Sequence, residues 1–287
     1  MGSSTMPGPS QDPAALLRSR RYVGLLVLAA VLGVPISVAA YGFLALVSGL
    51  QEWLFTDLPK ALGHASAPLW WPLPLLTLSG LLVGLTIRHL PGRGGHSPAD
   101  GFKAGGVPSP AELPGIAIAA LATLSLGAVL GPEAPLIALG AGLAASAVRL
   151  ARRDTPEQAT AVVAAAGSFA AVSTLLGSPL LGAFLLMEAS GLGGPTLGLV
   201  LVPGLVAAGV GSLIFVGLDS WTGLGTFSLA LPDLPSFAHP NLAQFGWALG
   251  IGLAAAVVGT AIRRLALLLR PVVERRLLLL TPLAGVV

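Results

Sequence analysis

Cysteine is absent from this chain of 287 residues. Its absence excludes disulfide bonds and metal sites built on thiolate ligands. The sequence also contains no His-Glu-x-x-His run and no Gly-x-Ser-x-Gly run, so two common signatures of hydrolytic enzymes are missing. We therefore expect no enzyme, no cofactor and no metal site.

Charged residues are scarce as well. Asp, Glu, Lys and Arg together make up 9% of the chain, whereas soluble domains contain roughly 25%. Hydrophobic residues make up 54% of the sequence, and the mean hydropathy is +0.87. This composition is typical of an integral membrane protein.

The basic residues do not predict a nucleic-acid-binding surface. The isoelectric point is near 10.0, but the arginines and lysines are dispersed between apolar segments and do not form one patch. Aromatic residues make up only 6% of the chain, too few for a surface on which bases stack. We therefore expect the lipid bilayer as the main partner, and no nucleic acid.

The apolar segments are of two kinds. Long runs, each near or above the roughly 20 residues that a transmembrane helix needs, occupy residues 22–50, 69–87, 195–217 and 241–262. Shorter segments, broken by Gly, Pro or a few polar residues, occupy 113–130, 133–151, 157–176, 179–189 and 277–287. We expect an all-α, polytopic membrane bundle with broken or re-entrant helices over residues 22–287, after a cytoplasmic tail of residues 1–21.

The arginines and lysines predict the orientation in the membrane. They cluster in the tail, at residues 88–103, at 149–153 and at 263–276. The loop 51–66 holds only Lys60, and the loop 218–240 holds none. Because basic residues favour the cytoplasmic side, we expect a cytoplasmic N-terminus in a multi-pass protein of the cell (plasma) membrane. Trp53, Trp70 and Trp71 are expected at the membrane interface.

Two carboxylates lie inside apolar segments, Glu133 and Glu188. An ionised side chain at the centre of a membrane helix costs at least about 2.5–3.5 kcal/mol. Such residues usually face the interior of a bundle or a water-filled path. Both are therefore candidate intramembrane site residues, although a structural role for Glu188, holding neighbouring backbone or an interface, is the stronger interpretation.

The surroundings of Glu133 predict a helix start. It directly follows Gly131-Pro132, and a proline is well tolerated in the first helical turn because its missing N–H would be unpaired there. The free N–H groups and the dipole of a helix N-terminus attract anions. A carboxylate at this place competes with a bound anion and leaves when it is protonated. The alternative is an ordinary buried carboxyl at a helix start.

Several short patterns carry a resemblance to a known family. Gly131-Pro132-Glu133-Ala134-Pro135 is similar to Gly-(Arg/Lys)-Glu-Gly-Pro, and Ala104-Gly105-Gly106-Val107-Pro108 is similar to Gly-Ser-Gly-Ile-Pro. The run Ala164-Ala165-Ala166-Gly167-Ser168, and the run from Leu176 through Gly182 with Phe184 and Glu188-Ala189 after it, match further patterns of the family. In this order the chain resembles the N-terminal half of CLC-type voltage-gated chloride channels and chloride/proton exchangers.

The resemblance implies a fold and a function. It implies the first of two inverted repeats and passive or gated passage of chloride or another small anion, with Glu133 as the gating residue. It implies a homodimer whose interface includes the helices of residues 179–217. The anion-binding residues that it implies are Gly105, Gly106, Val107, Pro108, Gly131, Ala134, Pro135 and Leu136.

The chain departs from the family pattern at several residues. Gly105 stands in place of a serine that contacts the anion, Pro132 in place of a basic residue, and Gly177 in place of an asparagine. Ala189 stands where exchangers of the family keep a proton-relaying glutamate. Alanine carries no proton, so we do not expect coupled exchange by that route.

A second repeat is not found in the sequence. The family's second half supplies a Gly-x-Phe-x-Pro helix start and a pore tyrosine, but Tyr22 and Tyr41 both lie in the first span. We therefore expect the chain to stop before the second repeat. Two alternatives stay open: a proton-coupled transporter of another anion that uses Glu133, and a non-conducting, half-length membrane protein.

Overall fold

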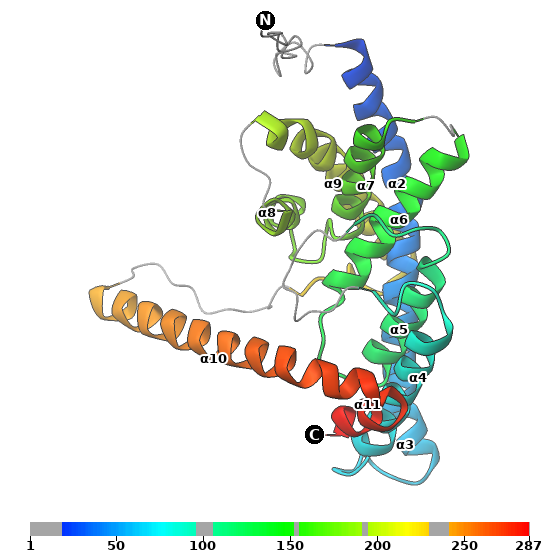
Figure 1. Ribbon diagram of the computed structural model, residues 1–287, viewed down its shortest axis with the longest axis vertical. Coiled ribbons are helices and arrows are strands. Elements are labelled where there is room, and N and C mark those ends of the chain that lie inside the picture. The colour runs from blue at the N-terminus through cyan, green and yellow to red at the C-terminus, as the bar shows by residue number, and fades with distance from the viewer. Residues whose placement is uncertain (1–18, 96–105, 152–154, 191–194, 230–240, 287) are drawn as a thin grey trace, which may run out of the picture.

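The computed structural model describes residues 19–95, 106–151, 155–190, 195–229 and 241–286. Within these ranges all regular structure is helical, which confirms the all-α prediction (Figure 1). In chain order the elements are α2 Arg20–Glu52, the π-helical segment η1 Trp53–Asp57, α3 Leu58–Ala61, α4 Pro72–His89, α5 Leu113–Ser125, α6 Glu133–Ala151, α7 Glu157–Ala171, α8 Pro179–Ser190, α9 Pro195–Thr222, α10 Leu242–Arg275 and α11 Leu277–Val286.

Proline sets the start of four consecutive helices. Helices α5 to α8 begin at the residues that the sequence predicts, and each has a proline in its first turn or directly before it. The fixed φ of proline suits a helix start, and its missing N–H costs nothing there. These helix starts are therefore determined by the nearby sequence.

The core of the bundle lies between α2, α6, α7 and α9, which run close together in Figure 1. Helix α7 is central and packs against each of the other three. Its residues Ala170 and Ala171 are fully buried, together with Leu136 of α6 and Phe215 of α9. Small residues on α7 let its neighbours approach closely, which is how membrane helices commonly pack.

Two glycines allow α6 and α7 to cross at close range. A Cβ added to Gly140 would collide with the carbonyl oxygen of Gly167, and a Cβ on Gly167 would collide with that of Gly140. Beside this contact, the Ser168 hydroxyl donates to the Ile137 carbonyl oxygen at 2.9 Å. The crossing therefore fixes the position of α6 relative to the centre of the bundle.

Helices α2, α7 and α9 meet around Gly211. The Ser37 hydroxyl donates to the Ala170 carbonyl oxygen at 3.2 Å. A Cβ on Gly211 would lie 2.7 Å from that oxygen and 2.7 Å from the Ser37 hydroxyl. At this point a hydrogen bond joins α2 to α7, and a glycine contact brings α9 against both. Elsewhere Tyr22 and Tyr41 of α2 form hydrogen bonds with Gly198 and Thr222 of α9.

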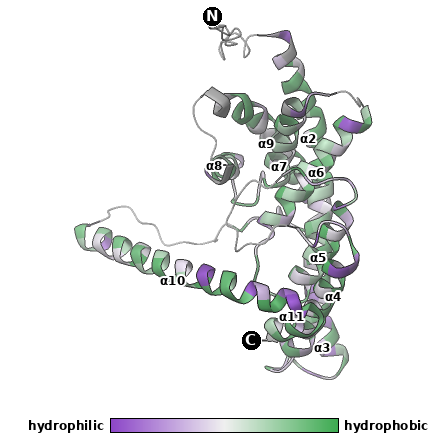
Figure 2. Ribbon diagram, viewed as in Figure 1, coloured by the Kyte–Doolittle hydropathy of each residue, from purple (hydrophilic) through white to green (hydrophobic). Residues whose placement is uncertain are grey.

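The C-terminal helices are arranged differently. Helix α11 packs closely on α4, where a Cβ on Gly80 would lie 2.5 Å from the Thr281 carbonyl oxygen. Helix α10 extends away from the bundle (Figure 1), and none of its described residues is buried. Figure 2 shows that α10 is mostly apolar over its first half, and its charged residues all lie in the second half.

Two expectations need correction here. The last long span was predicted to end near residue 262, but α10 continues to Arg275 over 34 residues. Its Arg270 Nε donates to Glu274 Oε1 at 2.8 Å, one turn further along, and such pairs stabilise helices. Trp71, expected at the membrane interface, is buried, and its Nε1 donates to the Leu54 carbonyl oxygen at 2.9 Å.

In the described part of the chain, four helical segments are long and apolar enough to cross a membrane: Tyr22–Ala61, Glu133–Ala151, Gly198–Thr222 and Leu242–Arg275. Shorter apolar helices lie at Leu113–Ser125, Ala159–Ala171 and Pro179–Glu188. A helix of 13 residues is only about 20 Å long and does not span a hydrocarbon core of about 30 Å. The short helices therefore depend on their neighbours in the bundle.

Candidate functional site

Glu133 is the first residue of α6, and apolar segments of the chain precede and follow it. Its side chain is partly exposed, and within the described residues its carboxylate makes no hydrogen bond or ion pair. It is folded back over Gly131, because a Cβ on Gly131 would collide with both the Oε2 and the Cδ of Glu133. The carboxylate thus covers the N-terminal end of α6.

The first turn of α6 offers few hydrogen-bond donors. The Leu136 N–H donates to the Pro132 carbonyl oxygen at 3.0 Å and is part of the helix. Pro135 has no N–H. The N–H groups of Glu133 and Ala134 have no partner in the part of the chain that the structure describes. These two donors and the positive end of the helix dipole are the anion-attracting elements here.

The side chains of the first turn of α6 differ in burial. Leu136 is fully buried in the core, so its side chain anchors the turn to the bundle. Ala134 is exposed on the opposite side of the turn. The first turn of α6 is therefore held rigidly on one side and open on the other.

The second predicted anion-binding segment precedes α5. Gly105 lies outside the described residues, Gly106 is exposed, and Pro108 is buried. The Ser109 N–H donates to the Glu112 Oε2 at 2.7 Å, which closes the turn that leads into α5. In the same turn, a Cβ on Gly92 would lie 2.7 Å from the Glu112 Cβ. Loop 91–95 therefore packs on this turn.

The two segments lie at opposite ends of α5 in the chain path. Leu113, the first residue of α5, packs against Gly142 in the middle of α6, where a Cβ would collide with it. Among the described residues, no hydrogen bond joins residues 106–108 to the first turn of α6. The structure thus places both segments next to α5 and α6, but it does not join them directly.

The third family-like segment forms the start of α8. Gly177 has a φ of 74°, a conformation that glycine adopts readily. The Ser178 hydroxyl then accepts a hydrogen bond from the Leu180 N–H at 3.3 Å, at the N-terminus of α8. Glu188, near the other end of α8, is exposed and has no hydrogen bond in the described ranges.

Two residues to which the sequence assigned no individual role support the site. Ser168 and Gly167 of α7 fix α6 through the hydrogen bond and the close contact described above. Both belong to the small-residue run 164–168, but the run itself does not indicate which residue faces α6. Spacing of small residues signals helix packing without naming the partner.

The titratable residues form no metal centre within the described ranges. There, no group of three or more His, Asp and Glu side chains lies close enough together to hold a metal ion. His89 is the last residue of α4, and its Nδ1 lies 3.0 Å from the Leu85 carbonyl oxygen.

Comparison with known proteins shows which family this architecture belongs to. The family model described as voltage gated chloride channel matches residues 80–287. YfeO of Salmonella paratyphi A and of Salmonella typhimurium, provisionally described as ion-transport proteins, are each 34% identical over 172 residues. That match covers 60% of this chain and 41% of the length of each relative.

A solved structure supports the fold. The crystal structure of a slow cyanobacterial Cl⁻/H⁺ antiporter superposes with a TM-score of 0.66 at 19% sequence identity. The superposition covers 91% of this chain and 63% of that chain. Together with the long apolar helices, these matches identify an integral, multi-pass membrane protein. The chain belongs to the voltage gated chloride channel family.

Proposed function

We propose that this chain contributes to a passive or gated pathway for chloride, or another small anion, across the plasma membrane. The observation that carries the proposal is the position of Glu133. Its carboxylate is folded back over Gly131 at the N-terminus of α6, where the N–H groups of Glu133 and Ala134 have no partner among the described residues. A negatively charged side chain at the N-terminus of α6 occupies the position where the helix terminus would otherwise attract a free anion.

The proposed gate works by competition. While Glu133 is ionised, its carboxylate covers the N-terminus of α6 and opposes the entry of a second negative charge. Protonation removes that charge, so the side chain swings away and an anion reaches the N–H groups of Glu133 and Ala134. The charge interaction at a helix terminus is about 0.3–1 kcal/mol, up to about 2. This range corresponds to a change in anion affinity from under twofold to about thirtyfold.

Passage without coupled proton transport follows from Ala189. This residue stands where exchangers of the family keep an inner glutamate, and alanine does not carry a proton. The neighbouring Glu188 is exposed on α8 and is a possible second intramembrane carboxylate. We propose that the backbone of residues 105–108 forms a second anion-binding segment, in addition to the first turn of α6.

A homodimer is the proposed assembly. Helices α8 and α9 would contribute to its interface. In support, α8 exposes several large apolar side chains, namely Leu180, Leu181 and Phe184. The proposed orientation places the N-terminus in the cytoplasm because the basic clusters are expected on that side.

The test is the pH dependence of anion flux in Glu133→Gln. In liposomes or cells that contain the chain in its functional assembly, we expect chloride flux to rise as the external solution is acidified. In Glu133→Gln we expect a high flux that no longer responds to external pH, because glutamine stays neutral. Glu157→Gln is the matched control, since Glu157 also lies in the first turn of a helix, α7, and should leave the pH response intact.

Other results would redirect the proposal. An unchanged pH response in Glu133→Gln would refute the gate. Saturable flux of an organic anion without chloride flux would favour a proton-coupled transporter of another anion. This alternative is worth testing because Gly105 stands in place of the family's anion-contacting serine. No flux of either kind would indicate a non-conducting membrane protein.

A further inference from the structure

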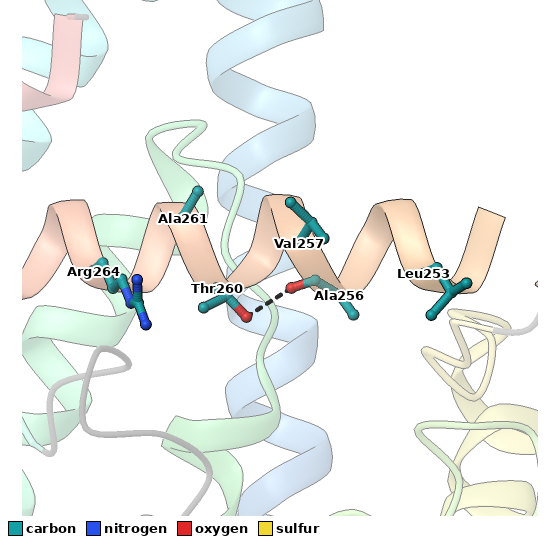
Figure 3. Close-up of a pocket in the computed structure, with 6 residues that line it drawn as sticks. All are labelled: Leu253, Ala256, Val257, Thr260, Ala261 and Arg264. Carbon is teal, nitrogen blue, oxygen red and sulfur yellow. Dashed lines mark hydrogen bonds between the residues drawn. The ribbon is translucent and has the colours of Figure 1, made fainter. Parts of the chain in front are cut away.

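The end of helix α2 contacts the loop that leads to Glu133. This loop, residues 126–132, joins α5 to α6. Another feature outside the candidate site is a shallow hollow on α10, lined by residues of that helix alone, from Leu253 to Arg264 (Figure 3). Nothing in the described chain covers the hollow. The contact at the end of α2, in contrast, has both of its partners in the described chain and lies directly before the candidate site.

The α-helical hydrogen bonding of α2 gives way to the π-helical turn η1. The Leu58 N–H donates to the carbonyl oxygen of Trp53, as the wider spacing of a π-helix requires. The next residue, Pro59, has no N–H. The Leu54 carbonyl oxygen accepts instead from the Trp71 Nε1, at 2.9 Å. Single π-helical turns are rare and are frequently found at functional sites.

The π-helical turn places Phe55 against the loop between α5 and α6. A Cβ on Gly127 would lie 2.7 Å from the Cζ atom at the tip of the Phe55 ring, so the ring lies directly on the Gly127 backbone. Gly127 has a φ of 94°, which glycine adopts readily and other residues rarely do. Beside this contact, Leu54 packs with Ala122 and Leu126 in a small apolar cluster, and Phe55 packs against that cluster. The ring therefore reaches the loop from a well-supported turn.

Gln51, in the last turn of α2, adds a hydrogen bond to the same part of the loop. Its Nε2 donates to the Leu124 carbonyl oxygen at 2.8 Å. The Gly127 N–H donates to that same oxygen at 3.4 Å, which closes the turn after α5. The side chains of Gln51 and Phe55 thus hold this turn from the same side.

Beyond Gly127 the loop is exposed. The side chain of Val129 is fully exposed, and that of Leu130 is more than half exposed. At the far end of the loop, the first turn of α6 is anchored by the buried side chain of Leu136. Residues 128–132 therefore run between two fixed points, the turn at Gly127 and the first turn of α6.

We propose that Phe55 is a positioning residue for the gate at Glu133. The ring holds Gly127, which limits where residues 128–132 lie and so keeps Gly131 beneath the Glu133 carboxylate. Without the ring, the loop moves, and the carboxylate no longer rests over the N-terminus of α6. The pH response of anion passage then weakens. This inference rests on the proposed gate and adds a residue from α2's end to it.

The test compares Phe55→Leu with Phe55→Met. Leucine and methionine have similar volumes and replace each other at little cost in a core, but only the longer methionine side chain reaches Gly127. With the chain in its functional assembly in liposomes, we expect Phe55→Leu to raise chloride flux at neutral external pH. Its flux should approach the pH-independent flux expected of Glu133→Gln. Phe55→Met should keep the wild-type pH response, and equal unfolding temperatures of the two variants show that the fold is intact.

Two further measurements separate positioning from a general effect on structure. Because the chain has no cysteine, a spin label on Val129→Cys reports on the loop alone. The label should become more mobile in Phe55→Leu and keep its wild-type mobility in Phe55→Met. Trp53→Ala, which removes an exposed ring from the same π-helical turn, should leave both the label and the pH response unchanged. In Glu133→Gln, adding Phe55→Leu should not change the flux further.

The gate and the role of Phe55 fail in different ways. A wild-type pH response in Glu133→Gln refutes the gate itself, and the inference is refuted with it. A flat response in Glu133→Gln together with a wild-type response in Phe55→Leu refutes only the role of Phe55. Equal loss of the response in Phe55→Leu and Phe55→Met, or unchanged mobility of the label in Phe55→Leu, would show that contact with Gly127 is not the cause. A further change of flux when Phe55→Leu is added to Glu133→Gln would show that Phe55 does not act through Glu133.

Discussion

Gly131 and Glu133 are the smallest unit on which the proposed gate depends. The carboxylate of Glu133 lies against the Cα of Gly131, in the space that a side chain at residue 131 would occupy. The absence of a side chain at residue 131 therefore determines where the charge of residue 133 rests. A glycine next to a carboxylate can thus matter through space alone, without any unusual backbone angle.

Gly131→Ala should weaken the pH response of transport and leave Glu133 in place. The added methyl group collides with the carboxylate, so the side chain moves away from the N-terminus of α6. We expect anion flux at neutral external pH to rise toward the value for Glu133→Gln. The measurement is chloride flux against external pH, with both variants in the same membranes.

Gly49→Ala is the control for this variant. Gly49 lies in α2, and a Cβ there meets nothing within 4 Å, so transport should keep its pH response. If Gly131→Ala behaves like Gly49→Ala, the position of the carboxylate does not determine the gate.

At the scale of helices, the crossing of α6 and α7 holds the candidate site in place. Gly167→Ala introduces a methyl group against the Gly140 carbonyl oxygen and the Ala144 Cβ, which lies 2.6 Å from the added atom. Overpacking of this kind typically destabilises a protein by 1–3 kcal/mol. We expect a lower unfolding temperature in detergent and a weaker pH response, because α6 is displaced.

Gly42→Ala serves as the matched control for the crossing. It also replaces a helical glycine, but in α2 and with no atom within 4 Å of the added Cβ. Its stability should be unchanged or slightly higher, since alanine favours a helix over glycine. Equal stability of Gly42→Ala and Gly167→Ala would show that the α6–α7 contact contributes little.

The helix boundaries show what the sequence is able to predict. The starts at Leu113, Glu133, Glu157 and Pro179 follow from nearby prolines and are confirmed by the structure. The predicted end of the last long span, near residue 262, was wrong. The arginines that follow residue 262 were interpreted as loop residues, whereas they continue the helix to Arg275. Arginine is a good helix former, and its long side chain reaches the aqueous interface from within a helix.

The contacts of the candidate site were harder to predict. The helix start at Glu133 is visible in the sequence, because a carboxylate follows Gly-Pro inside an apolar run. The supporting hydrogen bond from Ser168 to Ile137 cannot be predicted from the sequence. It joins residues on two helices, and the relative rotation of those helices depends on the packing of the whole bundle. Burial of Trp71 was missed for the same reason.

At the scale of the whole molecule, the basic clusters predict the orientation in the membrane. The chain contains no cysteine, so a single introduced thiol reports its own location. Ser66 and Ala111 are both exposed and lie before and after α4. We expect Ser66→Cys to react with a membrane-impermeant maleimide in intact cells, and Ala111→Cys to react only after permeabilisation.

The reverse labelling pattern would invert the proposed orientation. Labelling of both positions from outside would mean that α4 does not cross the membrane between them. The cysteine-free chain is the control for background reaction in both cases.

The length of α2 has a consequence for the response of the molecule to its lipid surroundings. Its 33 residues form a rod of about 50 Å, while the hydrocarbon core of a typical bilayer is about 30 Å thick. We therefore expect the rod to lean from the membrane normal or to extend beyond the hydrocarbon core, and a thicker bilayer to make it stand more upright. Because α7 and α9 pack on α2, that change of slope is transmitted to the centre of the bundle. Acyl chain length is thus a physical control on the shape of this protein.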